Sequence, residues 1–207
     1  ARISTRTRPD GTETPYEANA SYFSALGDGR HEGTDRQIAA FLCSQTIPLS
    51  LAGVPAVYLH SFTATPNDLQ AVEATGRARS INRRKWDAEE LEGVLADTTS
   101  PAHRVFTELA HRLRVRAAHP AFHPAAPQRV LDLGEELFAL ERTAPDGSER
   151  VLALHNVQNR RIALPGKRIL SLLEGKKTAT DLLHGAAFRP RTGIALDPFQ
   201  ALWLIPA

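Results

Sequence analysis

The spacing of apolar residues changes near residue 125, and this change restricts the possible fold more than any other feature of the chain. Before it, apolar residues recur at helical spacing, and one uninterrupted apolar run, GVPAVYLH, follows a predicted helix. After it, apolar and polar residues alternate in short runs. Helices next to a fully apolar strand are typical of an α/β fold, whereas alternation is typical of antiparallel sheets. The sequence therefore predicts an α/β region over residues 1–125 and an all-β region over 126–207.

Capping signals locate the two main helices of the first region. Thr34 followed by Gln37 has the form of a capping box, and Ser100 followed by Pro101 is typical of an N-cap and a first helical residue. Segment 1–14 is polar and is expected to be loop-like, and segment 61–100 is expected to be loop-rich, with a first helical turn at Asp87, Glu89 and Glu90. The predicted elements are a helix over 35–51 ending before Gly53, a buried strand over 53–60, and a helix over 101–119.

Six short runs in the second region predict strands. An Asp-Gly dipeptide at 146–147 lies between two of them and predicts a hairpin turn, because glycine adopts a positive φ at little cost. The number of strands favours a small antiparallel sandwich. The predicted strands are 129–133, 136–142, 150–157, 161–164, 168–173 and 201–206.

Composition excludes several classes of function. The 25 basic residues are nearly balanced by 23 acidic ones, so the strongly basic surface of a nucleic-acid-binding protein is not expected. No apolar run has the length of a membrane span. A single cysteine, Cys43, allows no internal disulfide and is typical of a reducing compartment. We therefore expect a cytoplasmic protein with no nucleic-acid partner and no membrane segment.

The stretch TGRARSINRRKWD, residues 75–87, is the strongest candidate binding segment. It carries five cationic side chains, and desolvating each would cost several kcal/mol, so some of them must face solvent or an anion. Arg79 and Arg83 offer planar donors suited to phosphate. A solvated loop remains the alternative. His60 ends the predicted strand, where ligands of parallel sheets bind, and is either a polar rim residue or a satisfied buried histidine.

Two further histidines have the spacing of metal ligands. His119 and His123 are four positions apart, but each is followed by proline, which disfavours a helical pair of ligands. No metal site is expected.

Five segments together resemble one enzyme family. TPYEANASYFSAL, GVPAVYLHS, TPNDL, TGRARSINR and HPAFHPAAPQ are similar, in this order, to the sucrose phosphorylase subfamily of the α-amylase (glycoside hydrolase 13) superfamily, near its sucrose 6-phosphate and glucosylglycerate phosphorylase branches. The resemblance implies that residues 1–125 form the C-terminal segment of a (β/α)8 barrel with its acceptor-site loops. It implies a β-sandwich C domain over 126–207.

The resemblance also implies an activity and a set of site residues. The family's reaction moves an α-glucosyl group from a sucrose-like or glucosylglycerate-like donor to inorganic phosphate with retention, and it needs no cofactor. Arg79 matches the arginine that contacts phosphate or the leaving group, and Arg83 would orient the phosphate or the loop. Tyr16 and Glu17 match a mobile acceptor loop. Glu17 stands where sucrose phosphorylases commonly carry glutamine, which leaves fructose, fructose 6-phosphate, glycerate and glycerol open as acceptors.

No catalytic residue is assigned to this chain. A retaining mechanism needs two carboxyl groups about 5 Å apart, and the resemblance implies that they precede residue 15. The chain is also shorter than the roughly 250 residues of a complete barrel. We expect the C-terminal part of a longer enzyme, partnered by the missing N-terminal part of the barrel and inactive alone. The alternatives are part of a hydrolase or transglucosidase of the same superfamily, and a non-catalytic carbohydrate-binding module.

Overall fold

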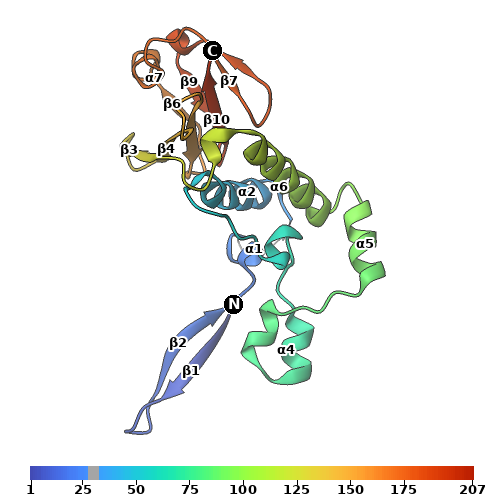
Figure 1. Ribbon diagram of the computed structural model, residues 1–207. Coiled ribbons are helices and arrows are strands. Elements are labelled where there is room, and N and C mark those ends of the chain that lie inside the picture. The colour runs from blue at the N-terminus through green and yellow to red at the C-terminus, as the bar shows by residue number, and fades with distance from the viewer. Residues whose placement is uncertain (28–32) are drawn as a thin grey trace. The chain divides into compact units, whose positions relative to one another are not determined.

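The computed structural model describes residues 1–27 and 33–207, which fold into two compact units (Figure 1). The first, here called the hairpin unit, comprises residues 1–38 and 57–106. The second, the sheet unit, comprises 39–56 and 107–207. The predicted boundary at residue 125 falls inside the sheet unit, and the division into a barrel segment and a C domain there stays a prediction.

The hairpin unit begins with two paired strands. Strands β1 (Arg2–Thr7) and β2 (Glu13–Asn19) are antiparallel, and the turn between them uses Gly11 at a φ of 82°. The side chain of Asp10 accepts a hydrogen bond from the backbone N–H of Thr12 at 2.9 Å. The prediction that residues 1–14 are irregular was therefore wrong. Most residues of the two strands are exposed, because neither face of the hairpin lines a core.

Short helices follow in the same unit. The segment 61–100, expected to be loop-rich, also contains short helices. The first helical turn expected at Asp87, Glu89 and Glu90 is confirmed, since Asp87 accepts hydrogen bonds from the N–H groups of Glu89 and Glu90, and Asp68 accepts one from the N–H of Ala71. The helical elements are α1 (Tyr22–Ala25), α3 (Leu59–Phe62), α4 (Leu69–Thr75), the 3₁₀ turn η1 (Ala78–Asn82) and α5 (Ala88–Ala96).

Two longer helices begin in the hairpin unit and end in the sheet unit. They are α2 (Asp35–Ser50) and α6 (Pro101–Ala118), close to the predicted bounds. The capping signals are confirmed: Thr34 Oγ1 accepts a hydrogen bond from the N–H of Gln37 at 3.2 Å, and Ser100 Oγ accepts from the N–H of His103 at 3.0 Å. None of the helices in the described ranges is both long and apolar enough to cross a membrane.

The predicted strand over 53–60 is not formed. Residues 53–58 are irregular, and helix α3 begins at Leu59. A parallel strand needs hydrogen-bonding neighbours, and no described strand pairs with this run. As a result Val54 is 81% exposed and Tyr58 60% exposed. The apolar sequence is that of a buried strand, but the strands that would cover it are not among the described residues.

The sheet unit contains a six-stranded antiparallel sheet and a two-stranded one. The larger has the order β3-β4-β5-β10-β7-β8, and the smaller pairs β6 with β9. Their apolar faces share one core. The hairpin predicted at 146–147 is confirmed, with Gly147 at a φ of 73° between β4 and β5. The strands are β3 (Gln128–Leu131), β4 (Leu137–Thr143), β5 (Arg150–Asn156), β6 (Ile162–Leu164), β7 (Ala179–Asp181), β8 (Ala187–Phe188), β9 (Ile194–Leu196) and β10 (Ala201–Pro206).

Five of the six predicted strands form. The sixth, 168–173, is instead helix α7 (Gly166–Leu172), which places Ile169 in the core. A short apolar run does not distinguish a strand from a buried helical turn by itself. Strands β7, β8 and β9, each of three residues or fewer, were not predicted. Two 3₁₀ turns, η2 (Pro120–Phe122) and η3 (Pro190–Thr192), complete the unit.

Helices complete the core of the sheet unit. Trp203, on β10, donates from Nε1 to Ser50 Oγ on α2 at 2.8 Å. Cys43, also on α2, donates to the carbonyl oxygen of Asn156 at 3.4 Å, and burial raises the pKa of its thiol to about 11. Residues 39–50 therefore belong to the folding unit of the sheet, although they lie far from it in the sequence.

Candidate functional site

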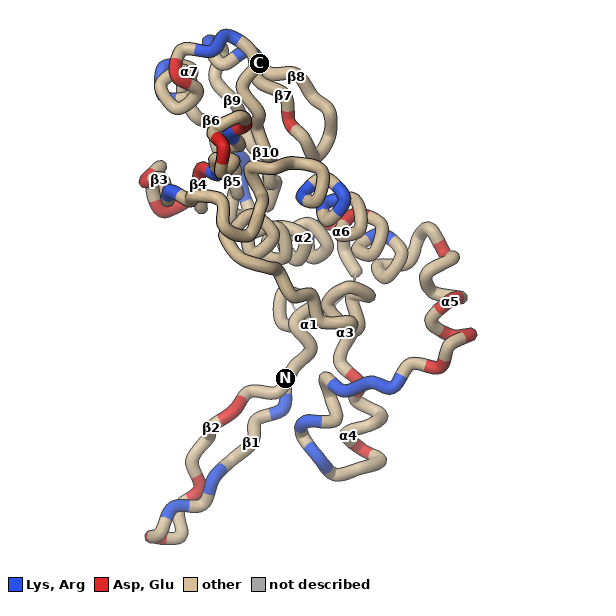
Figure 2. Tube along the Cα trace, in the orientation of Figure 1, with Lys and Arg blue, Asp and Glu red and all other residues tan. Residues whose placement is uncertain are grey.

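The arginine-rich stretch 75–87 has a defined backbone in the hairpin unit. Ile81, in η1, is fully buried, and its carbonyl oxygen accepts a hydrogen bond from the N–H of Asp68 at 2.8 Å. The side-chain amide of Asn82 donates to the carbonyl oxygen of Ala20, just after β2, at 3.3 Å. Figure 2 shows the basic residues strung along this stretch beside α4. The segment is thus anchored to α4 and to the chain after β2, which fixes the position of its backbone.

The ring of His60 contacts the backbone of this stretch. Its ring is 8% exposed, and both ring nitrogens lie close to carbonyl oxygens, Nδ1 3.2 Å from that of Asn82 and Nε2 2.9 Å from that of Arg84. Of the two interpretations of His60, the structure favours the buried histidine; a neutral imidazole carries one N–H and can donate to only one of the two carbonyl oxygens. It positions the backbone of the arginine-rich stretch and does not line an open rim.

Arg79 and Glu17 form a bidentate ion pair. Nε of Arg79 donates to Oε2 of Glu17 at 3.1 Å, and Nη2 donates to Oε1 at 3.1 Å. The side chains are 54% and 31% exposed. The hydrogen bond to Glu17 raises the pKa of the Arg79 guanidinium, with a smaller contribution from Tyr16. Nη1 of Arg79 forms no hydrogen bond within residues 1–27 and 33–207, so one end of the guanidinium remains open to a ligand.

A β-bulge carries Tyr16. Ser4 pairs with Glu17 and Thr5 with Pro15, so Tyr16 is the extra residue on β2. Bulges bend a strand and redirect its side chains, and the phenol of Tyr16 is 59% exposed. Glu17, the next residue, is the partner of Arg79, and Tyr16 contributes to the raised pKa of that guanidinium.

Arg83 follows η1 directly. Its backbone N–H donates to the carbonyl oxygen of Ser80 at 3.2 Å, and its guanidinium pairs with no carboxylate in the described parts of the chain. Arg84, by contrast, is paired with Glu90 and lies 4.0 Å from the ring centre of Trp86. Of these two neighbouring arginines, Arg83 is the one available to an anion.

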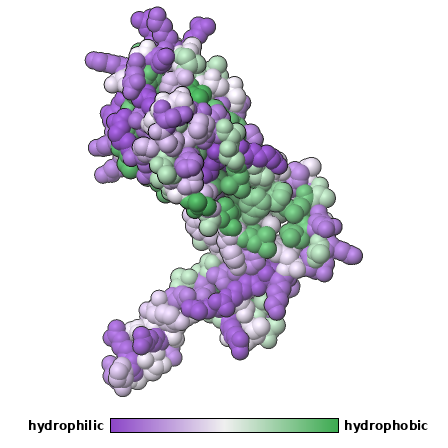
Figure 3. Space-filling view, viewed as in Figure 1, coloured by the Kyte–Doolittle hydropathy of each residue, from purple (hydrophilic) through white to green (hydrophobic). Residues whose placement is uncertain are grey.

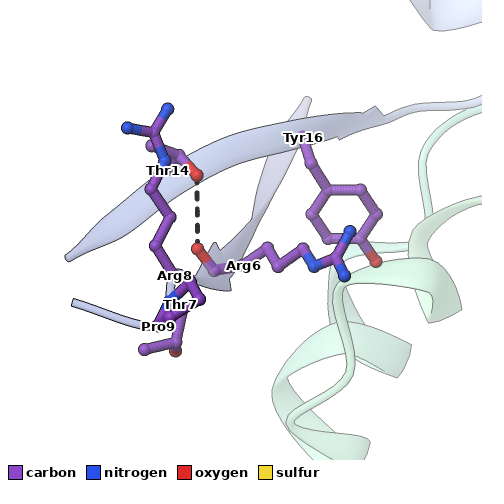
Figure 4. A pocket seen from close by; sticks show the side chains of 6 residues that line it. All are labelled: Arg6, Thr7, Arg8, Pro9, Thr14 and Tyr16. Atoms are coloured by element: carbon purple, nitrogen blue, oxygen red, sulfur yellow. Dashed lines mark hydrogen bonds between the residues drawn. The ribbon is translucent and has the colours of Figure 1, made fainter. Parts of the chain in front are cut away.

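An open hollow of about 600 Å³ lies along the β1–β2 hairpin (Figure 4). Sequence analysis missed this feature, because the segment was expected to be irregular. The signal that could have found it is the Asp-Gly dipeptide at 10–11 between runs rich in threonine, the same signal that located the hairpin at 146–147. The hollow is lined by Arg6, Thr7, Arg8, Pro9, Thr14 and Tyr16.

The two histidines with metal-ligand spacing have separate partners. Nδ1 of His119 lies 2.7 Å from Oε2 of Glu149, and Nδ1 of His123 accepts a hydrogen bond from the N–H of Ala125 at 3.2 Å. Across residues 1–27 and 33–207, no three histidine, cysteine or acidic side chains are grouped so that they could hold a metal ion.

Solved structures with a similar fold are α-amylase-superfamily enzymes. AmyP in complex with maltose matches with a TM-score of 0.64 at 15% identity, over 86% of this chain and 36% of that one. Sucrose 6F-phosphate phosphorylase from Thermoanaerobacter thermosaccharolyticum matches with a TM-score of 0.58 at 23% identity, over 75% and 28%. The fold is therefore that of part of a glycoside hydrolase 13 enzyme, and the predicted fold class is confirmed.

Sequence similarity narrows this class to phosphorylases. Glucosylglycerate phosphorylase from Allomeiothermus silvanus is 38% identical over 99% of this chain. Further glucosylglycerate phosphorylases and sucrose phosphorylases match at lower identity. No protein-family model matches the sequence. The chain spans about a third of the length of these glucosylglycerate phosphorylases. Its homologues are glucoside phosphorylases, which confirms the resemblance found in the sequence.

Proposed function

We propose that the protein to which this chain contributes is a retaining glucoside phosphorylase. It transfers an α-glucosyl group from a glucosylglycerate-like or sucrose-like donor to inorganic phosphate. The observation that carries this proposal is the 38% identity to a glucosylglycerate phosphorylase, which extends over 99% of the chain. The proposed reaction needs no cofactor, because a nucleophile, an acid/base and phosphate are sufficient for it.

The hairpin unit supplies the phosphate and acceptor subsite in this proposal. Arg79 binds a phosphate oxygen through its open Nη1 end, while Glu17 holds the other edge of the guanidinium in place. Such charge-assisted contacts are about twice as strong as neutral hydrogen bonds. Arg83 supplies a second cation, Tyr16 shapes the acceptor pocket, and His60 positions the loop.

The bond-making residues belong to the rest of the enzyme. Retention requires a carboxylate nucleophile and a second carboxyl group about 5 Å away that acts as acid and then base. We place both in the part of the full-length protein that corresponds to the other two thirds of its relatives, and so expect this chain alone to be inactive. In the second step a phosphate oxygen bonds to the anomeric carbon as the ester bond to the nucleophile breaks.

Replacing Arg79 in the full-length enzyme tests the proposal. In phosphorolysis, Arg79→Ala should reduce kcat/KM for inorganic phosphate at least tenfold. One charge-assisted contact in the transition state contributes more than about 1.4 kcal/mol. Slow hydrolysis of the same donor should change little, because water needs no cation. The control is Arg77→Ala in the same stretch, which leaves the Arg79–Glu17 pair intact.

Three outcomes would count against this assignment. An equal loss of phosphorolysis and hydrolysis would mean that Arg79 supports the fold and not the phosphate. A rate independent of phosphate in the unaltered enzyme would indicate a hydrolase or transglucosidase of the same superfamily. If Arg77→Ala lowered phosphorolysis as much as Arg79→Ala, Arg79 would contribute only its positive charge and no specific contact with phosphate.

A further inference from the structure

The ring of His60 contacts the arginine-rich stretch at two points. Nδ1 lies 3.2 Å from the carbonyl oxygen of Asn82, and Nε2 lies 2.9 Å from that of Arg84. These oxygens stand on either side of Arg83 in the chain. The visible surface of the β1–β2 hairpin and of the region around α4 is mostly hydrophilic (Figure 3), but His60 is only 8% exposed. A buried ring thus contacts the backbone on both sides of an exposed arginine.

The protonation state of the ring decides how many of these contacts are hydrogen bonds. A carbonyl oxygen only accepts, so each contact needs an N–H on the ring. Neutral imidazole carries one N–H, whereas imidazolium carries two. No other donor within residues 1–27 and 33–207 bonds to either oxygen. The neutral ring therefore leaves one of the two oxygens without a donor from these residues, and the imidazolium ring satisfies both.

The surroundings of the ring offer an imidazolium cation no carboxylate. In the described parts of the chain no acidic side chain lies at ion-pair distance from it. Asp68 already caps α4, and Glu90 is paired with Arg84. The two carbonyl oxygens therefore stabilise the charge, while the cations of the stretch oppose it. The charged or titratable side chains around the ring and its partners are Tyr58, whose ring centre lies 4.8 Å away, Asp68, Arg79, Arg83, Arg84 and Glu90.

The backbone of Arg83 is held from both sides. Its φ of −129° and ψ of 35° belong to neither a helix nor a strand. Its N–H donates to the carbonyl oxygen of Ser80 at 3.2 Å, and the carbonyl oxygens before and after it meet the ring of His60. Release of one of these oxygens frees the main chain next to Arg83. The direction of its guanidinium, which pairs with no carboxylate in the described residues, then becomes less fixed.

We propose that His60 is a positioning residue that couples anion binding to pH. Its imidazolium form donates to the carbonyl oxygens of Asn82 and Arg84 and so holds Arg83 in place for phosphate. Loss of one proton to solvent releases one of these oxygens and weakens binding of the anion. This inference rests on the proposed function, in which Arg83 is the second cation of the phosphate subsite.

The sign of the coupling follows from the number of bound protons. The form with both hydrogen bonds carries one proton more than the form with one. Anion affinity is therefore highest at low pH and falls as the pH rises through the titration of the ring. Phosphate itself gains negative charge as the pH rises, so its own ionisation has to be separated from the effect of His60.

Neutron diffraction from crystals of the full-length protein tests the protonation step directly. Crystals in deuterated buffer at about pH 5.5 and about pH 8 bracket the range in which histidine changes charge. Two deuterons on the ring of His60 are expected at the lower pH and one at the higher. The same number of deuterons at both pH values would overturn the proposal. This measurement needs no variant and no activity.

Calorimetric titration of sulfate into the full-length protein without a donor measures the effect on anion binding. Sulfate stays a dianion over this range, so its own charge is constant. The dissociation constant should rise about fivefold from about pH 5.5 to about pH 8, the fold-change that one hydrogen bond contributes. In His60→Gln, whose amide does not titrate, this pH dependence should be lost. Equal sulfate binding by the unaltered protein at both pH values, or none at either, would overturn the proposal.

His103→Gln is the matched control. His103 is also in the hairpin unit, but its Nδ1 lies 2.7 Å from the carbonyl oxygen of Leu95, outside the arginine-rich stretch. Its replacement should leave the pH dependence of sulfate binding unchanged. Arg83→Gln separates positioning from charge, because it should weaken sulfate binding and also remove its pH dependence. A pH dependence that persists in Arg83→Gln, or that His103→Gln also removes, would overturn the proposal in favour of general charge attraction.

Kinetics with phosphate separate this inference from the proposed function. The ratio of KM for phosphate between His60→Gln and the unaltered enzyme should fall from about fivefold at about pH 5.5 to about one at about pH 8. Ionisation of phosphate cancels in this ratio, and kcat should stay within about twofold. A rate independent of phosphate would contradict the proposed function, while the neutron and sulfate results would still decide the role of His60. Confirmed phosphorolysis with pH-independent sulfate binding would contradict the pH coupling alone.

Discussion

Different interactions stabilise the interior of the sheet unit and the interior of the hairpin unit. In the sheet unit two antiparallel sheets and α7 share one apolar core, and Trp203 and Leu154 are completely buried in the unit. In the hairpin unit the few buried apolar side chains include Phe23 and Ile81. Backbone caps, buried hydroxyl groups and the ring of His60 hold its loops in place. The sheet unit is stabilised mainly by one apolar core, whereas the short helices and strands of the hairpin unit depend more on caps and other polar contacts.

The exposed apolar residues support this contrast. Most of them belong to the hairpin unit, where no described segment covers them. A surface like this is typical of a region that is completed by other parts of a protein, which agrees with a chain that spans about a third of its relatives. The large apolar side chains exposed in the hairpin unit are Ile3, Tyr16, Tyr22, Tyr58, Leu59, Leu69 and Phe106.

The largest expected effect tests whether the two units differ in packing energy. Trp203→Ala should lower the free energy of unfolding by about 4 kcal/mol, because it leaves a large cavity and removes the hydrogen bond to Ser50. Leu69→Ala, at a half-exposed position in the hairpin unit, should cost less than about 1 kcal/mol. Denaturant unfolding of each variant measures both values. Similar losses would mean that the hairpin unit has a core of comparable strength.

The next effect is a pH dependence confined to the sheet unit. Burial lowers the pKa of His155 to about 4, so between pH 6.5 and 4 the unfolded chain binds a proton that the folded chain does not. Stability is therefore present in full above pH 6.5 and is lost as the pH falls toward 4, by roughly 3 kcal/mol.

The variant His155→Gln isolates this effect. Its free energy of unfolding should lack the part of the acid slope that His155 causes, while the slopes from other groups remain. Unfolding curves recorded from pH 7 to pH 4 for both proteins give the difference. Parallel curves would show that His155 is protonated as easily in the folded chain as in the unfolded one.

The smallest effect concerns the ion pair of the hairpin unit. Glu17→Gln should change the free energy of unfolding little, because exposed pairs contribute little and Arg79 is 54% exposed. The substitution should nevertheless increase the mobility of the Arg79 side chain, which NMR relaxation of its Nε–H group measures. A large loss of stability would show that the pair supports the unit as well as the site.

Much of this molecule could be read from local sequence. Capping signals located α2 and α6, alternation located five strands, and the dipeptide at 146–147 located a hairpin, because these patterns depend on neighbouring residues alone. The family resemblance likewise depends only on the order of short motifs, and it brought Arg79 and Glu17 into one proposed site. The sequence could not show that these two side chains form a bidentate pair.

Tertiary structure decided the rest. An apolar run becomes a strand only where other strands pair with it, so GVPAVYLH stays irregular in the part of the chain that the structure describes. Burial decided between the two interpretations of His60, because both its ring nitrogens meet backbone carbonyl oxygens from a segment more than twenty residues away. The bulge at Tyr16 depends on the register between two strands, which no local pattern specifies. Local sequence thus determined which elements form, while long-range pairing determined which side chains meet.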